Sequence, residues 1–120
     1  MKIVVFGLSI TSAWGNGHAT TFRALFEALH RRGHDILFYE KNLEWYASNR
    51  DLPHPPYCRL RLYEDWIDIA VEVKRELSEA DVGLVGSYFP DGIAATEQLL
   101  ESSARVKARS AIGRAASLTK

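Results

Sequence analysis

Cysteine is almost absent from this 120-residue chain, which has Cys58 as its one thiol. A single cysteine cannot form an internal disulfide, and this favours a reducing, cytoplasmic setting. No apolar run approaches the roughly 20 residues that span a bilayer, and the N-terminus lacks a signal-peptide pattern. Acidic and basic residues balance at 15 each, so no net field attracts nucleic acid or membranes. We therefore expect a cytoplasmic protein without a membrane span or a nucleic-acid partner.

The signatures of two kinds of catalytic site are also missing. No Gly-x-Ser-x-Gly segment occurs, so a hydrolase of that type is not expected. His30, His34 and His54 have no metal-ligand spacing with Cys58, so we predict no metal site. We interpret Cys58, at the start of a predicted strand, as a packed thiol.

The balanced total charge hides a marked asymmetry along the chain. Residues 1–104 contain ten basic and fifteen acidic residues, a net charge of −5, whereas residues 105–120 contain five basic residues and no acid or aromatic. The length suffices for one small domain with a core. We therefore predict a domain over residues 1–104, followed by a basic Ala/Ser/Arg tail over residues 105–120 that is helical or disordered.

The pattern of apolar residues predicts alternating strands and helices. Three apolar runs do not alternate with polar residues, which is typical of strands buried on both faces; they are Lys2–Phe6, Asp35–Glu40 and Asp81–Ser87. Cys58–Tyr63 alternates and predicts an edge strand. Residues 22–29 and 66–77 have helical spacing, and Asp91 predicts the N-cap of a later helix. This order predicts an α/β fold, a Rossmann-like three-layer domain with a mostly parallel sheet.

Ligands of open α/β sheets bind beyond the carboxyl ends of the strands, where three segments of this chain are expected. The first, Ser9–Thr21, contains a loop of about ten residues, longer than is usual after a strand. Its glycines allow a ligand close to the backbone, and the helix start favours an anion. His18 is a candidate general base. The alternative is a plain turn with a histidine cap. The candidate binding residues of this segment are Thr11, Ser12, Trp14, Gly15, Asn16, Gly17 and His18.

The other two segments follow the second and the last of the buried strands. In Glu40–Arg50, the candidates Glu40, Trp45 and Tyr46 combine a carboxylate with aromatic faces, which suits a sugar. A surface loop pinned by aromatic residues is the alternative. In Gly86–Gly92, the candidates are Ser87, Tyr88 and Asp91. For Asp91 we favour a helix cap over a catalytic acid.

A dinucleotide-binding site is a weaker alternative for the same edge. Gly15 and Gly17 lie too far after the first strand for the usual fingerprint, and Thr20 stands where its third glycine belongs. Glu40 does end the second strand, about where a ribose-binding acid would lie. An NAD-type fragment therefore stays open without being favoured.

Three segments of the chain resemble the N-terminal half of the GT-B glycosyltransferases: the strand at Met1–Ile3, Trp14–Thr21 and Arg32–Ile36. The chain is most similar to the CgeB-like group, which is related to spore-maturation proteins. The N-terminal domains of that group have segments similar to Trp45–Pro53 and Gly86–Gly92. The resemblance covers roughly residues 1–100, and its motifs occur in the same order.

This resemblance implies a two-domain enzyme in which the N-terminal domain binds the sugar acceptor and a C-terminal domain binds a nucleotide-sugar donor. Gly15, Gly17 and His18 would border the donor phosphates or the acceptor, and Tyr88, Pro90 and Asp91 would line the cleft. A nucleotide-sugar is then the expected donor, and no firmly bound cofactor is expected. The donor domain would be supplied in cis or in trans.

The segment after Leu100 departs from the pattern of this family, which implies another buried strand there. We hypothesise a truncated or altered end, and we expect self-association through the sheet edge left open. For the function, the alternative to the acceptor-side domain of a glycosyltransferase is a non-catalytic α/β binding or regulatory domain.

Overall fold

The computed structural model describes residues 1–14, 17–111 and 114–117. Its elements in chain order are β1 (Lys2–Phe6), α1 (Gly17–Arg31), β2 (Asp35–Lys41), α2 (Glu44–Ala47), β3 (Arg59–Tyr63), α3 (Trp66–Glu79), β4 (Val82–Gly86), α4 (Gly92–Glu101), β5 (Val106–Ala111) and β6 (Arg114–Ser117). No helix in this described part of the chain is long and apolar enough to cross a membrane.

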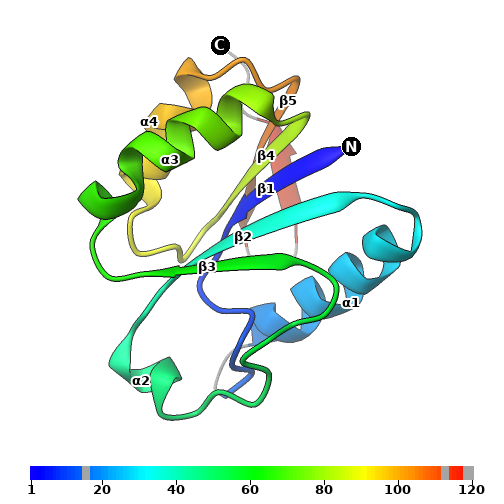
Figure 1. Cartoon of the computed structure of the whole chain (residues 1–120), viewed down its shortest axis with the longest axis vertical. Coiled ribbons are helices and arrows are strands. Elements are labelled where there is room, and N and C mark those ends of the chain that lie inside the picture. The colour runs from blue at the N-terminus through cyan, green and yellow to red at the C-terminus, as the bar shows by residue number, and fades with distance from the viewer. Residues whose placement is uncertain (15–16, 112–113, 118–120) are drawn as a thin grey trace.

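The strands form one sheet in the order β3-β2-β1-β4-β5-β6 (Figure 1). The strands from β1 to β5 pair in parallel, and only the β5–β6 pair is antiparallel. The predicted α/β, Rossmann-like class with a mostly parallel sheet is confirmed. The strand order reverses direction between β1 and β4, which is the switch point where such sheets bind ligands.

Alternate residues of the central strands point into two separate cores, which explains their unbroken apolar runs. On one face, Val4 and Phe6 of β1 pack with residues of α3 and α4, such as Ile69 and Leu99. On the other face, Val5 packs with Phe22 and Phe26 of α1 and with Phe38 of β2. The sheet is therefore the middle layer, with α1 on one side and α3 and α4 on the other.

The helix α1 ends just before a glycine, Gly33, which follows its last turn. Gly33 has a φ of +84°, a left-handed conformation that glycine adopts without strain. The backbone N–H groups of Gly33 and His34 donate to the carbonyls of His30 and Leu29, which closes the last helical turn. The chain then enters β2 directly at Asp35.

The prediction of a helical or disordered tail is wrong for residues 106–111 and 114–117. Val106 lies opposite Val82 in a parallel ladder, so β5 pairs with the edge of β4. The sequence pattern predicts that this edge is unpaired. Strand pairing uses backbone N–H and C=O groups, and a strand near a sheet edge tolerates polar side chains. Lys107 also anchors this segment by donating to the carbonyl of Leu100 at 3.0 Å.

Candidate functional site

A buried carboxylate fixes the loop that follows β1. Glu40, at 0% exposure, accepts hydrogen bonds at Oε1 from the backbone N–H groups of Ile10 (2.7 Å) and Thr11 (3.1 Å). Its Oε2 accepts from Thr11 Oγ1 at 2.7 Å and lies 3.6 Å from Nη2 of Arg50. Glu40 therefore holds the loop after β1 from the interior of the protein. The interpretation of Glu40 as a ligand contact is not supported, because protein donors occupy both oxygens.

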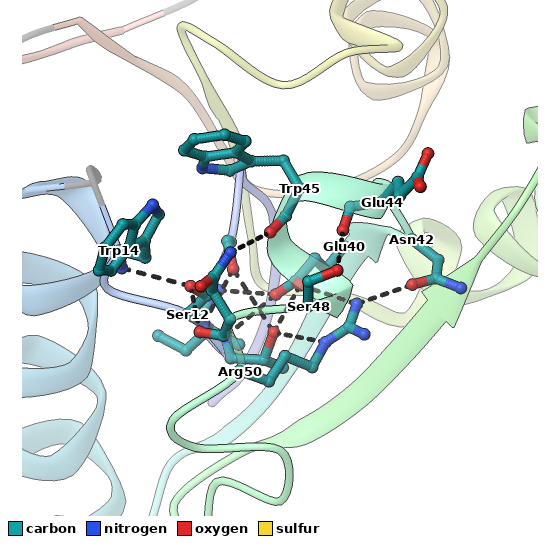
Figure 2. Close-up of polar contacts among 12 residues, drawn as sticks. Ser12, Trp14, Glu40, Asn42, Glu44, Trp45, Ser48 and Arg50 are labelled. Atoms are coloured by element: carbon teal, nitrogen blue, oxygen red, sulfur yellow. Dashed lines mark hydrogen bonds and ion pairs between the residues drawn. The ribbon is translucent and has the colours of Figure 1, made fainter.

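The same loop is bonded to the segment that follows α2. Ser12 Oγ donates to the carbonyl of Asn49 at 2.7 Å, and the N–H of Leu52 donates to the carbonyl of Thr11 at 2.9 Å. Arg50 Nε donates to Thr11 Oγ1 at 2.9 Å (Figure 2). Thr11 and Ser12 are buried, so these two predicted binding residues hold the loops together instead of facing solvent.

A bidentate ion pair closes the outer side of this loop. Arg23 of α1 donates to both oxygens of Asp51, at 2.8 and 2.9 Å, and its Nε donates to the carbonyl of Ile10. The N–H of Ala13 also donates to Asp51. The hydrogen bonds from Arg23 hold the pKa of Asp51 well below its usual range.

The lowered pKa of Asp51 predicts a pH-dependent loss of stability. Its stabilising effect is complete above the unfolded-state pKa near 3.8 and fades as the pH falls toward the lowered folded-state value. We expect Asp51→Asn to be less stable than the wild type at neutral pH, and the difference to shrink below about pH 4. Urea unfolding between pH 7 and 2 measures it, and Arg23→Gln is expected to lose the same pH-dependent part. A difference that stays constant with pH would contradict the prediction.

Asp91 joins the loop after β4 to the ends of β2 and β3. Its Oδ2 accepts from Tyr63 Oη at 2.7 Å and lies 3.4 Å from Lys41 Nζ. Burial and this hydrogen bond raise the pKa of Tyr63 well above its usual value. Asp91 does occupy the N-cap position of α4, but its side chain makes no capping hydrogen bond with the described residues. The prediction is thus correct in placing Asp91 at the N-cap position, but its carboxylate bonds Tyr63 and not the backbone of α4.

The exposed candidates are mainly aromatic. Trp14 and Trp45 are 57% and 60% exposed, and their ring centroids lie 6.5 Å apart although Trp14 precedes α1 and Trp45 lies in α2. Ser87 and Tyr88 are exposed on the loop after β4. Tyr46 of α2, by contrast, is buried, so its ring is not an exposed face for a ligand.

Several predicted residues of the first loop cannot be placed in this site. Gly15 and Asn16 lie outside the described residues, as does the side chain of His18. Gly17 is exposed at the start of α1. The role of His18 as a general base therefore stays a prediction.

Two of the cavities among the described residues lie at opposite edges of the sheet. One of about 500 Å³ lies at the carboxyl ends of β4 and β5, where Ser87, Gly92 and Arg109 contribute to its lining. The other, of about 360 Å³, lies where β2 and β3 begin and is lined by residues that include His30 and Cys58. Burial raises the pKa of the Cys58 thiol to about 12, which keeps it protonated and suits a packed thiol. Within the described residues, no His, Cys, Asp and Glu side chains gather in a group able to hold a metal ion.

Sequence reasoning missed Lys41 and Tyr63, and it did not identify Arg50 or Asp51 as partners in this network. Lys41 and Tyr63 are the last residues of β2 and β3, so the rule that ligands lie at strand ends would have selected them. For the pairing of Arg50 with Glu40, no local signal exists, since it depends on how two loops meet.

Comparison of the chain with protein-family models, with curated proteins and with solved structures finds no match in any of the three.

Proposed function

We propose that this chain is the acceptor-side domain of a nucleotide-sugar-dependent glycosyltransferase that works with a separate donor-binding domain. The observation that carries the proposal is the arrangement of the three predicted loops at the carboxyl edge of a parallel sheet. Lys41, Tyr63 and Asp91 are joined there by hydrogen bonds beside the switch point. The resemblance to the GT-B glycosyltransferases, and to their CgeB-like group, supports the same edge.

Each part of this edge would have its own task in the transfer. Asp91, a half-buried carboxylate, would accept a hydrogen bond from an acceptor hydroxyl, while Lys41 and Tyr63 keep it oriented. His18 would take the proton of the attacking hydroxyl. The cavity lined by Ser87 and Arg109 would face the donor, whose phosphates suit a guanidinium.

The experiment begins with the encoding locus, which is searched for a second reading frame that encodes a donor-binding domain. The two chains are then purified, and transfer from radiolabelled UDP-, GDP- and TDP-sugars is measured with each chain alone and with both. We expect transfer only from the pair. We expect a loss of about 100-fold or more with His18→Ala, the size typical of general-base catalysis, and of about tenfold or more with Asp91→Asn, which changes a positioning group. Ser103→Ala serves as the control, because Ser103 lies just before β5 and therefore at the opposite, amino-terminal edge of the sheet.

A non-catalytic sugar-binding domain is the second candidate. It is favoured because Arg23, Arg50 and Lys41 are each paired with a carboxylate. These cations would have to leave their partners to bind the phosphates of a nucleotide-sugar. A locus without any donor domain, or a pair that consumes no nucleotide-sugar, would refute the transferase and leave this candidate. The NAD-type alternative is weakened, because Glu40 is buried and engaged by the protein.

A further inference from the structure

Two exposed indoles form a shared aromatic surface at the carboxyl edge of the sheet. Trp14 precedes α1 and Trp45 lies in α2, yet their rings are 6.5 Å apart at an interplanar angle of 49° (Figure 2). Both are more than half exposed. Leaving two of the largest apolar side chains in water is unfavourable, and grouped exposed aromatics commonly mark a binding surface.

The backbones that carry the two indoles are held in place by hydrogen bonds. The N–H of Trp14 donates to Ser12 Oγ at 3.2 Å, and Ser12 in turn donates to the carbonyl of Asn49. The side-chain amide of Asn49 donates to the carbonyl of Trp45 at 2.8 Å. A continuous chain of bonds therefore links the two tryptophans, so a ligand would meet an aromatic surface that is already organised.

The charges beside the indoles favour an uncharged ligand. Arg50 lies against Glu40 and also donates to Asn42, Arg23 is bound to Asp51, and Lys41 lies against Asp91. A phosphate would have to displace these carboxylates. The exposed Glu44, next to Trp45, adds an acceptor that hydroxyl groups can use and that repels anions.

From these contacts we propose that Trp14 and Trp45 form a stacking platform for the pyranose rings of a neutral oligosaccharide. The C–H face of a pyranose is complementary to the negative face of an indole, while its hydroxyls suit carboxylate and amide partners. A ring inserted between the two indoles would need about 7 Å or more, twice the van der Waals contact distance. The ligand therefore lies across the pair, with one sugar unit on each indole, and a disaccharide binds more tightly than a monosaccharide.

If the proposed function is correct, this oligosaccharide is the sugar acceptor, and only that assignment rests on the proposed function. The binding itself is measured without any transfer. Isothermal titration calorimetry of the full chain uses glucose-, galactose-, mannose- and N-acetylglucosamine-based mono- and disaccharides, with UDP, adenosine and inorganic pyrophosphate as the charged or nucleobase probes. We expect at least one neutral disaccharide to bind, and its affinity to fall at least tenfold in Trp14→Ala and in Trp45→Ala.

Matched variants separate stacking from general effects on the fold. Trp14→Phe and Trp45→Phe keep an aromatic face and are expected to stay within about fivefold of wild type. The variant Ile67→Ala/Val71→Ala removes apolar groups that are 82% and 81% exposed on α3, and it is expected to bind normally. Circular dichroism checks that every variant is folded.

Three results would overturn the platform: no binding of any neutral saccharide, unchanged affinity in both alanine variants, or tryptophan-dependent binding of UDP, adenosine or pyrophosphate instead. Saccharide binding by this chain without any sugar transfer by the pair of domains would refute only the proposed function. Transfer that persists unchanged in both alanine variants, while saccharide binding is lost, would show that the platform does not hold the acceptor.

Discussion

Replacing Glu40 by alanine is expected to lower the free energy of unfolding by about 3–5 kcal/mol, the cost typical of breaking a buried ion pair. The substitution leaves Arg50, whose side chain is only 15% exposed, without its carboxylate. It also removes the acceptor of the Ile10 and Thr11 N–H groups, and unpaired buried donors are costly. A domain with the usual stability of about 5–15 kcal/mol would lose a large part of it. Urea unfolding followed by circular dichroism measures the change.

Two further variants test whether burial of this carboxylate is the cause. Glu40→Gln keeps an amide oxygen as an acceptor while removing the charge, so its loss should be smaller than that of the alanine variant. Asp35→Ala removes a carboxylate that is also bonded by an arginine, Arg59, but in an exposed pair, so its cost should be below about 1 kcal/mol. Equal losses in Glu40→Ala and Asp35→Ala would show that the buried network does not hold the loop.

Replacing Gly7 by alanine is expected to destabilise the domain by about 1–3 kcal/mol, as overpacking of a core does. Gly7 directly follows β1, and an added Cβ would lie 2.5 Å from Cζ and 2.8 Å from Cε2 of Phe38. Phe38 cannot move aside easily, since it is fully buried and packs edge-on against Phe22 and Phe26. Thermal and urea unfolding of the variant measure the loss.

A second glycine provides the control for this prediction. Gly92 is the first residue of α4, where a Cβ would meet no other described side chain within 4 Å, and alanine has the higher helix propensity. Gly92→Ala should therefore be neutral or slightly stabilising. Combining Gly7→Ala with Phe38→Leu should cost less than the sum of the two single changes, because the smaller side chain relieves the clash. Strict additivity would contradict the proposed contact.

The central strands could be predicted from the sequence because their signal is local. The strand predicted at Lys2–Phe6 is found with the same bounds, and that predicted at Asp35–Glu40 extends by one residue to Lys41. Both lie between two cores, so their inner positions, Ile3–Phe6 and Ile36–Tyr39, are apolar on both faces of the sheet. The edge position of β3 also followed from the alternation of Leu60 and Leu62 with arginines.

The candidate site could be predicted in position but not in the roles of its residues. Strand ends in a parallel sheet share one edge, so the three loops were correctly assigned to it. Whether a polar residue there faces a ligand or the protein depends on which side chains meet across loops. Glu40 therefore had the sequence signature of a ribose contact and is instead the buried support of the loop after β1.

The amino-acid sequence by itself determined the layered α/β fold and the sheet edge at which the three candidate loops lie, because periodicity of apolar residues directly encodes burial. Only the tertiary structure decided that residues 106–111 form a strand, since the free backbone edge of β4 pairs with them despite their weak apolar pattern. It also decided that Asp91 bonds Tyr63 instead of capping α4, and that Trp14 and Trp45 meet. Such contacts join residues distant in the chain, so no local pattern specifies them.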